Sequence, residues 1–298
     1  MSQFNFKGII TALVTPFKNG DVDEASLHKL LEQQLENGIE GLVVNGTTGE
    51  SPSLTPQEVK RIFTITKEKV GCKIPVIVGT GSNNTAHTLA FTQEVEKWGA
   101  DAALVVVPYY NKPPQRGMVE HFTKIAKCCS IPQILYNVPG RTVVSLSDES
   151  IAELSKINNI IGVKEASGDP NRANKLRSMC RPNFVLLSGD DSSCVEFMLQ
   201  GGDGVISVIS HVIPKDLVQI SKKARNHESA ALEEYVKFSQ LNSDLCLESN
   251  PIPVKEALHL MGLLQTDELR CPLAPMLPEN TEKLRKTLLE LQLLKGDL

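Results

Sequence analysis

The chain has 298 residues, of which 41% are hydrophobic and 22% are charged, and its formal net charge is -4 at pH 7. These values exclude a disordered chain and argue against a nucleic-acid-binding protein, since no basic stripe is present to neutralise phosphates. The length exceeds that of an ordinary single domain, but α/β barrels commonly run to about 250 residues as one domain, so one large domain with an appendage fits.

The N-terminus and the cysteines predict a soluble, cytoplasmic protein. Residues 1–7 lack a charged segment followed by an apolar one, so no secretory signal is visible, and no apolar run approaches the ~20 residues of a membrane span. The seven cysteines are scattered, with no CxxC pair and no histidine cluster at zinc spacing. We interpret them as reduced thiols in the core and expect no metal site.

Eight short apolar segments recur along the chain, and each is followed by a polar connection and a helical pattern. We predict strands at residues 9–14, 41–44, 76–79, 102–107, 133–137, 160–164, 184–188 and 204–208. Helix signals lie between them. Thr55, Pro56 and Glu58 have the spacing of a capping box with proline at the first helical position. Strict alternation of strands and helices predicts parallel strands with right-handed crossovers.

Eight such units predict a closed (β/α)8 TIM barrel over residues 1–225. The alternative is an open doubly wound sheet, but that fold normally carries a Gly-rich phosphate turn after its first strand, and residues 15–20 (TPFKNG) are not one. Residues 226–298 predict a C-terminal helical extension, with helices at 228–247, 254–264 and 279–294. We expect Pro251 and Pro253 to interrupt it, since two prolines cannot lie inside one helix.

Lys164 ends the sixth predicted strand, whose other residues are typical of a strand buried on both faces. Burial disfavours the charged ammonium and leaves part of the population as a neutral amine that can attack a carbonyl carbon. Such a lysine is a candidate for Schiff-base formation. On the strand alone, the alternative is a lysine whose head group reaches water.

Other candidates follow the carboxyl ends of the strands, where the loops of a barrel converge. The Gly46-Thr47-Thr48-Gly49 turn can present N–H groups and hydroxyls to an anion, or can be purely structural. Tyr136 is either a core aromatic or, beside a Schiff-base lysine, a group that moves protons. Arg141 is either a solvated loop cation or, if it faces the barrel mouth, a grip for a carboxylate.

Together these segments resemble the dihydrodipicolinate synthase branch of the pyruvate-dependent class I aldolases, whose superfamily includes N-acetylneuraminate lyase. The resemblance extends from residues 10–17 (ITALVTPF) to residues 250–255 (NPIPVK), and is carried by residues 46–51, 109–113, 136–142 and 163–166. It implies an enzyme that condenses pyruvate with L-aspartate-4-semialdehyde through a lysine Schiff base, without metal or organic cofactor.

The resemblance also implies roles for particular residues. Lys164 corresponds to the lysine that forms the imine with pyruvate, and Tyr136 to the tyrosine that relays protons. Thr47 links that tyrosine to Tyr110, which is supplied across a dimer interface.

Substrate-binding positions follow from the same resemblance. Thr48 and its neighbouring amides match the group that holds the pyruvate carboxylate, and Arg141 matches the arginine that receives the carboxylate of the semialdehyde. Gly189 and Ile206 match backbone positions that line the pocket. The resemblance further implies a homodimer or homotetramer.

Two alternatives to this function stay open. A sibling aldolase or lyase acting on a sugar acid would share Lys164 and Tyr136, although Arg141 and Tyr110 favour a short aldehyde that carries a carboxylate. A barrel that binds a small carboxylate without turnover has no support in the sequence, because every catalytic position is intact.

Some bacterial members of the family are inhibited by lysine at a cleft in the dimer interface. Three positions there are retained, and three differ: His87 stands where sensitive members commonly carry a glutamate, and Pro56 and Val59 replace histidines. The retained positions are Ser51, Asn83 and Tyr109. We therefore expect L-lysine to inhibit weakly or not at all.

Overall fold

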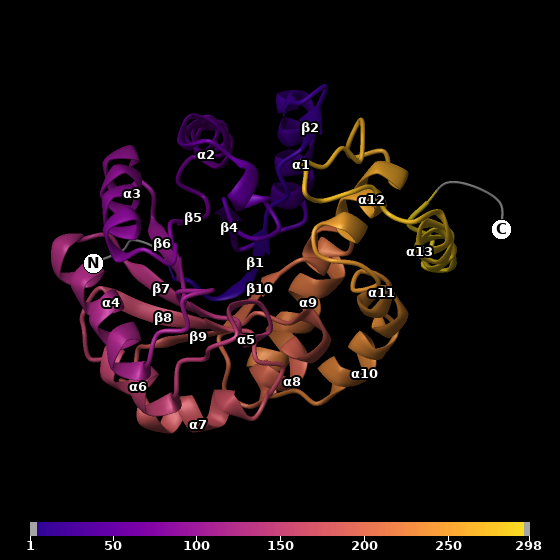
Figure 1. Cartoon of the computed structure of the whole chain (residues 1–298). Coiled ribbons are helices and arrows are strands. Elements are labelled where there is room, and N and C mark those ends of the chain that lie inside the picture. The colour runs from indigo at the N-terminus through magenta and orange to yellow at the C-terminus, as the bar shows by residue number, and fades with distance from the viewer. Residues whose placement is uncertain (1–4, 295–298) are drawn as a thin grey trace.

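The computed structural model describes residues 5–294 and contains a closed barrel of eight parallel strands (Figure 1). Going round the barrel, the order is β1-β10-β9-β8-β7-β6-β5-β4, and β1 pairs with β4 to close it. The strands are β1 (Gly8–Ala12), β4 (Gly41–Val44), β5 (Val76–Gly79), β6 (Ala102–Val106), β7 (Gln133–Asn137), β8 (Ile160–Glu165), β9 (Val185–Ser188) and β10 (Gly204–Ser207). The predicted TIM barrel is confirmed, and the predicted strand ends differ from the observed ones by at most two residues.

Helices surround the strands, as Figure 1 shows. They are α1 (Glu24–Glu36), α2 (Pro56–Val70), α3 (Thr85–Trp98), α4 (Gln115–Cys128), α6 (Asp148–Leu154), α7 (Arg172–Met179), α8 (Cys194–Leu199) and α9 (Pro214–Arg225), with the short α5 (Pro139–Thr142) after β7. The predicted capping box is present: the Thr55 side chain accepts from the Glu58 N–H, and the Glu58 carboxylate accepts from the Thr55 N–H. Local capping chemistry thus places the start of α2 where the sequence predicts it.

The strands separate two hydrophobic cores. One fills the barrel interior and includes Ile10, Ile134, Tyr136, Leu187 and Ile206. The other, larger core lies between the strands and the surrounding helices. Because both faces of each strand are buried, the strand sequences are continuously apolar instead of alternating.

The C-terminal region is helical, as predicted, and consists of α10 (Ala230–Val236), α11 (Ser239–Asp244), α12 (Ile252–Leu260) and α13 (Pro278–Glu290). The prediction of a single helix over residues 228–247 was wrong. The chain leaves helical geometry at Phe238, whose buried ring packs in the core. The expectation for the prolines was half right. Pro251 caps α12, but Pro253 lies in its first turn, where no N–H is needed.

A short hairpin was not predicted. β2 (Phe17–Lys18) and β3 (Asp21–Val22) are antiparallel and are joined by Asn19 and Gly20, both in the left-handed region at φ 54° and 84°. Asn-Gly is a strong two-residue hairpin signal, so the sequence contained it. The turn binds the C-terminal region, since the Asn19 and Gly20 N–H groups donate to the Glu268 carboxylate.

The expectation that the cysteines are core thiols was wrong for most of them. All seven are free; Cys129, Cys180 and Cys194 are buried, whereas the others are exposed. Those exposed are Cys72, Cys128, Cys246 and Cys271. Among residues 5–294, no helix is both long and apolar enough to cross a bilayer. Part of the segment used to predict the absence of a secretory signal, residues 1–4, lies outside the described residues.

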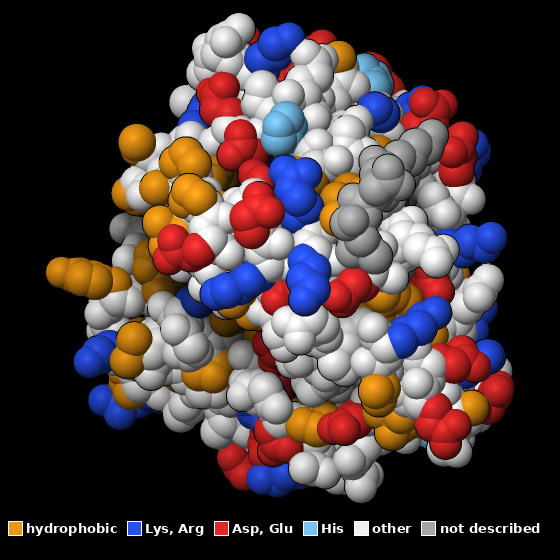
Figure 2. Space-filling view, turned by 90° about the vertical axis from the view of Figure 1, so that its right-hand side faces the viewer, with side chains coloured by type: hydrophobic (Ala, Val, Ile, Leu, Met, Phe, Trp, Pro, Cys, Tyr) orange, Lys and Arg blue, Asp and Glu red, His pale blue; other side chains and the backbone are white. Residues whose placement is uncertain are grey.

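Charged side chains of both signs are interspersed over the face that carries the C-terminal helices (Figure 2). This mixture agrees with the small net charge of the chain. Such a mixture is ordinary for a globular protein, and this face has no large area of one charge sign that would attract charged ligands from a distance.

Candidate active site

Lys164 and Tyr136 are neighbours because their strands pair. Tyr136 on β7 lies opposite Lys164, which in turn lies opposite Leu187 on β9. Tyr136 and Leu187 belong to the core inside the barrel, so Lys164 also points inward. Its residue exposure is 7%, and its Nζ lies 4.3 Å from the centre of the Tyr136 ring. The predicted burial of Lys164 is confirmed.

The amine of Lys164 has no ion-pair partner among residues 5–294. Asp190 and Asp191, which follow β9, are the acidic residues on which its charge acts. Burial raises the pKa of both carboxyl groups, and attraction to Lys164 opposes the rise. Within the described part of the chain, neither carboxylate forms an ion pair with the Lys164 amine.

Gly189 and Ile206 lie in the same interior. A Cβ at Gly189 would stand 3.0 Å from Lys164 Cε and 2.6 Å from Ala166 Cβ, so a larger residue would displace the lysine. Ile206 is 1% exposed and lies on β10 within the core inside the barrel. The structure therefore places Gly189 directly against Lys164 and Ile206 in the wall of the barrel.

The turn after β4 is tightly fixed. The Gly49 N–H donates to the Gly46 carbonyl at 3.1 Å, and the Glu50 N–H donates to the Thr47 carbonyl at 3.0 Å. The Thr15 hydroxyl donates to the Gly49 carbonyl at 2.8 Å. Within the described part of the chain, the Thr47 and Thr48 N–H groups donate to no partner. Adjacent free N–H groups in a turn form a concavity that suits an anion.

Thr48 is almost fully buried at 2% exposure. Its hydroxyl accepts a hydrogen bond of 2.9 Å from the side-chain amide of Asn250, which lies in the C-terminal region. Sequence reasoning did not single out Asn250, and its 202-residue separation from Thr48 gave no local signal.

A cavity of about 670 Å³ opens at the carboxyl ends of the strands and brings together Thr47, Tyr136 and Arg141. Arg141 is exposed there and has no ion-pair partner within residues 5–294. Apolar side chains, including Leu104, Val106 and Val138, line most of the rest. The expectation that Arg141 faces the mouth of the barrel therefore agrees with the structure.

Other predicted site residues do not line this cavity. Lys164, Thr48, Gly189 and Ile206 are not among its lining residues. Tyr110 points away from the body of the chain, with 88% exposure and a left-handed φ of 73°. Its neighbour Tyr109 is 40% exposed. A single chain thus does not bring Tyr110 to Tyr136.

The residues that follow Tyr136 and Lys164 form a second cluster, on the outer face of the same strands. Glu165 is 3% exposed and accepts from the Asn137 side-chain amide at 3.0 Å. It forms a 2.8 Å ion pair with Arg172. Burial raises the pKa of Glu165, and Arg172 opposes the rise. Sequence reasoning missed this cluster, although strand alternation places residue i+1 on the opposite face.

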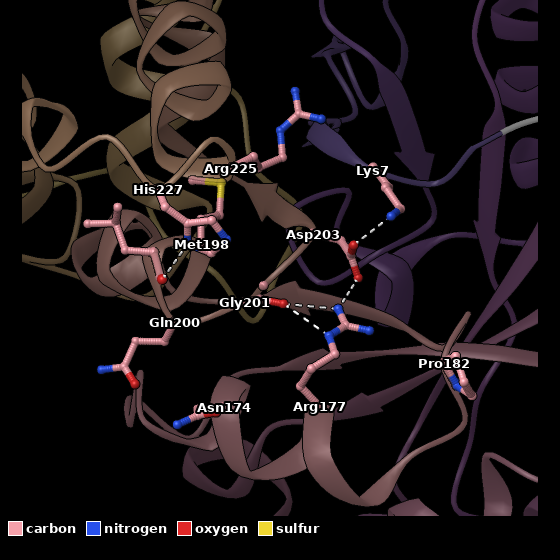
Figure 3. Close-up of a pocket in the computed structure, with 12 residues that line it drawn as sticks. Lys7, Asn174, Arg177, Pro182, Met198, Gln200, Gly201, Asp203, Arg225 and His227 are labelled. Atoms are coloured by element: carbon pink, nitrogen blue, oxygen red, sulfur yellow. Dashed lines mark hydrogen bonds and ion pairs between the residues drawn. The ribbon is translucent and has the colours of Figure 1, made fainter.

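A larger cavity of about 940 Å³ lies at the other end of the barrel (Figure 3). Its cations are already paired: Asp203 binds Lys7 at 2.8 Å and Arg177 at 2.5 Å. Arg225 binds Glu40 at 2.9 Å. Barrel enzymes use the carboxyl ends of their strands. Among residues 5–294, the larger cavity has no Lys or Arg without an ion-pair partner, whereas Arg141 lines the smaller one. We therefore assign the candidate site to the smaller cavity.

Comparison with known proteins agrees with this geometry. Residues 5–291 match the model of the dihydrodipicolinate synthetase family. This chain belongs to that family. It is 53% identical over 282 residues to the 4-hydroxy-tetrahydrodipicolinate synthase of Bdellovibrio bacteriovorus, with 94% of this chain and 96% of the relative covered.

Solved structures give the same result. The chloride-inhibited dihydrodipicolinate synthase of Acinetobacter baumannii complexed with pyruvate is 41% identical, with a TM-score of 0.94 over 97% of this chain and 100% of that chain. A protein described as the first monomeric dihydrodipicolinate synthase variant is 42% identical, with a TM-score of 0.94 over 97% and 98% of the two chains.

The residues expected at a lysine cleft border the same 670 Å³ cavity. Its lining includes Pro56, Val59 and His87, as well as Ser51 and Tyr109. Asn83 is not part of that lining. The three positions expected to differ from lysine-sensitive members therefore line the cavity of the candidate site.

Proposed function

We propose that this chain catalyses the reaction of a 4-hydroxy-tetrahydrodipicolinate synthase, the condensation of pyruvate with L-aspartate-4-semialdehyde in lysine and diaminopimelate biosynthesis. The observation that carries the proposal is Lys164, a buried amine that lies against Tyr136 and has no ion-pair partner within residues 5–294. Family membership and the names of the relatives support it.

The chemistry begins at the Lys164 amine. The neutral nitrogen adds to the ketone carbon of pyruvate, and loss of water from the carbinolamine gives an iminium ion. The positive nitrogen withdraws electrons, so the pyruvate methyl group loses a proton and becomes an enamine. The enamine carbon attacks the aldehyde carbon. The amine of the semialdehyde then attacks the iminium carbon, closes the ring and releases Lys164.

Proton transfer is the role we assign to Tyr136. Dehydration requires a proton on the carbinolamine oxygen, and the Tyr136 ring already lies beside Lys164 Nζ. Thr47 connects Tyr136 to Tyr110 of the partner subunit, a role supported by the exposure of Tyr110 on its own chain. We therefore propose a homodimer or a homotetramer built from such dimers.

Substrate carboxylates meet separate groups in this proposal. Thr48 and the free N–H groups of the turn hold the pyruvate carboxylate, while Gly189 and Ile206 shape the wall around the bound carbon atoms. Arg141, which is exposed at the mouth and has no ion-pair partner among the described residues, receives the carboxylate of the semialdehyde. The reaction then needs no metal and no organic cofactor.

Residues 1–225 form the catalytic barrel in this proposal, and residues 226–298 form the helical extension. We place the enzyme in the cytoplasm, where its substrates are metabolised. The test is an assay of purified protein with pyruvate and L-aspartate-4-semialdehyde, with Lys164→Ala as the control. Product formation that Lys164→Ala abolishes supports the proposal. Cleavage of a sugar acid such as N-acetylneuraminate, without condensation of the semialdehyde, would favour the sibling aldolase instead.

A further inference from the structure

A buried ion pair joins the C-terminal helices to the turn after β4. Lys255 on α12 contacts Glu50 with Nζ and Oε1 2.7 Å apart, and the two side chains are 0% and 1% exposed. Their separation in sequence is 205 residues. A buried ion pair is weak evidence for stability, because desolvation of both charges offsets their attraction. The pair therefore needs another explanation.

Every polar group of this pair has a defined partner. Lys255 Nζ also donates to the Glu268 carbonyl at 2.6 Å and lies 4.3 Å from the centre of the Phe17 ring. The second oxygen of Glu50 accepts from the Arg270 N–H at 3.0 Å. The carboxylate is therefore fixed in position and direction, and not merely neutralised.

The backbone of Glu50 is strained. Its φ is 57°, in the left-handed region that residues other than glycine rarely adopt. In this conformation its N–H closes the turn by donating to the Thr47 carbonyl at 3.0 Å. Strain of this kind persists only when surrounding contacts over-determine it, and the fixed Glu50 side chain supplies such contacts.

The same segment of the C-terminal region holds the turn at a second point. Asn250 donates to the Thr48 hydroxyl at 2.9 Å, five residues before Lys255. Asn250 and Lys255 thus contact two residues of one turn, Thr48 and Glu50. Both contacts are made to the turn that carries the Thr47 and Thr48 N–H groups.

We propose that Glu50 and Lys255 are positioning residues for the reaction: their ion pair holds the Thr47-Thr48 turn in the geometry that receives the carboxylate of pyruvate. The assignment of pyruvate to this turn rests on the proposed function. The ion pair itself acts through the turn and touches no substrate. In this proposal the C-terminal helices therefore help to position the groups that bind pyruvate.

The test compares Glu50→Gln with wild-type protein. The amide keeps the size of the side chain and leaves Lys255 bonded to the Glu268 carbonyl, but removes the charge that holds the turn. We expect KM for pyruvate to rise roughly tenfold, equivalent to about 1.4 kcal/mol, while KM for the semialdehyde changes less than about twofold. Amide hydrogen exchange in residues 45–51 should become faster. The double variant Glu50→Gln with Lys255→Met should show the same two changes.

Thr287→Val is the matched control. Thr287 is buried in α13, and its hydroxyl donates to Asp244 in α11 at 2.5 Å, away from the turn. This variant should lower stability without changing either KM or the exchange of residues 45–51. If Glu50→Gln lowers stability but behaves like Thr287→Val in KM and exchange, the ion pair is purely structural and the inference is overturned.

Failure of the proposed function would look different. In that case the wild-type protein would not condense the two substrates, and KM values could not be compared. Hydrogen exchange alone would then show whether the ion pair anchors the turn. Faster exchange of residues 45–51 in Glu50→Gln would support the anchoring of the turn, and unchanged exchange would overturn it.

Discussion

The interior of the barrel and its junction with the C-terminal helices each bury one lysine, in opposite surroundings. At the junction, Lys255 contacts a carboxylate and a carbonyl; burial lowers the pKa of its ammonium, and Glu50 opposes this. In the barrel, Lys164 lies against the Tyr136 ring and has no ion-pair partner within residues 5–294. The two lysines therefore share burial and differ in their contacts. In the proposed function Lys164 is the nucleophile, whereas Lys255 is a structural cation held by its carboxylate.

Replacement of the two lysines should differ most strongly in its effect on the free energy of unfolding. Lys255→Met leaves the Glu50 carboxylate buried without its cation, and we expect the free energy of unfolding to fall by about 3–5 kcal/mol. Lys164→Met removes an unpaired amine, and the change should stay within about 1 kcal/mol. Urea denaturation at pH 7 measures both values. Equal losses in the two variants would break the comparison.

Acid should destabilise the protein because His211, like the two lysines, is buried, and burial disfavours its charged form. Burial lowers the pKa of His211 to about 4. Its Nε2 accepts from the Val14 N–H, so the folded protein holds the ring neutral. In the unfolded chain His211 takes up a proton below pH 6.5, whereas in the folded protein it does so only near pH 4. The stability that neutral His211 contributes is therefore complete above pH 6.5. It decreases by about 3 kcal/mol as the pH falls towards 4.

His211→Gln isolates that contribution. Glu165, Asp190 and Asp191 have raised pKa values and act in the opposite sense, because they favour the folded protein as the pH falls. The fall in unfolding free energy between pH 7 and pH 4 should be smaller in His211→Gln than in the wild-type protein. An identical fall would show that His211 does not titrate as described.

Arg141 extends the comparison to an exposed cation that forms no ion pair within residues 5–294. Arg141→Ala removes a charge-assisted grip of about 1.5–3 kcal/mol, so KM for aspartate semialdehyde should rise roughly ten- to a hundredfold. Formation of the pyruvate imine should largely survive. If pyruvate trapping by borohydride falls equally, Arg141 serves the first substrate or the structure.

Tyr110 tests whether the barrel interior is complete within one chain. Tyr110→Phe and Lys164→Ala proteins should each be inactive. A mixed dimer can assemble one intact site, so mixing equal amounts should restore up to about a quarter of wild-type activity. Size-tagged subunits show whether exchange has occurred. No recovery despite exchange would mean that each chain supplies its own proton relay.

The smallest effect concerns L-lysine. Its two ammonium groups need carboxylates or several acceptors, and Pro56, Val59 and His87 offer neither beside the cavity. Initial rates at saturating pyruvate should show half-inhibition only above about 1 mM lysine. Sub-millimolar inhibition would mean that other groups bind the ligand. In that event His87→Glu should tighten inhibition further, and if it does not, the cleft lies elsewhere.

Local signals explain what the sequence could predict. The apolar segments locate the strands because both faces are buried, and Thr55 with Glu58 locates the start of α2. The hairpin at Asn19 and Gly20 was missed although its signal is equally local. The break at Phe238, whose ring is buried, has no such signal in the sequence.

Long-range contacts explain what the sequence could not predict. Lys164 was found because a lysine in an apolar strand is conspicuous. Lys255 lies in an equally apolar helix, but its role depends on Glu50, 205 residues away, which no spacing reveals. The proposed role of Tyr110, which is 88% exposed on this chain, depends on assembly, and no spacing within one chain reveals it.

The central claim is that the unpaired amine of Lys164, and no other lysine, attacks pyruvate. Incubation with pyruvate and borohydride, followed by mass spectrometry of peptides, tests it most directly. We predict one reduced pyruvyl group, located on Lys164 and absent from Lys164→Ala. An unmodified wild-type protein, or an adduct on Lys255, Lys112 or another lysine that persists in Lys164→Ala, would contradict the account.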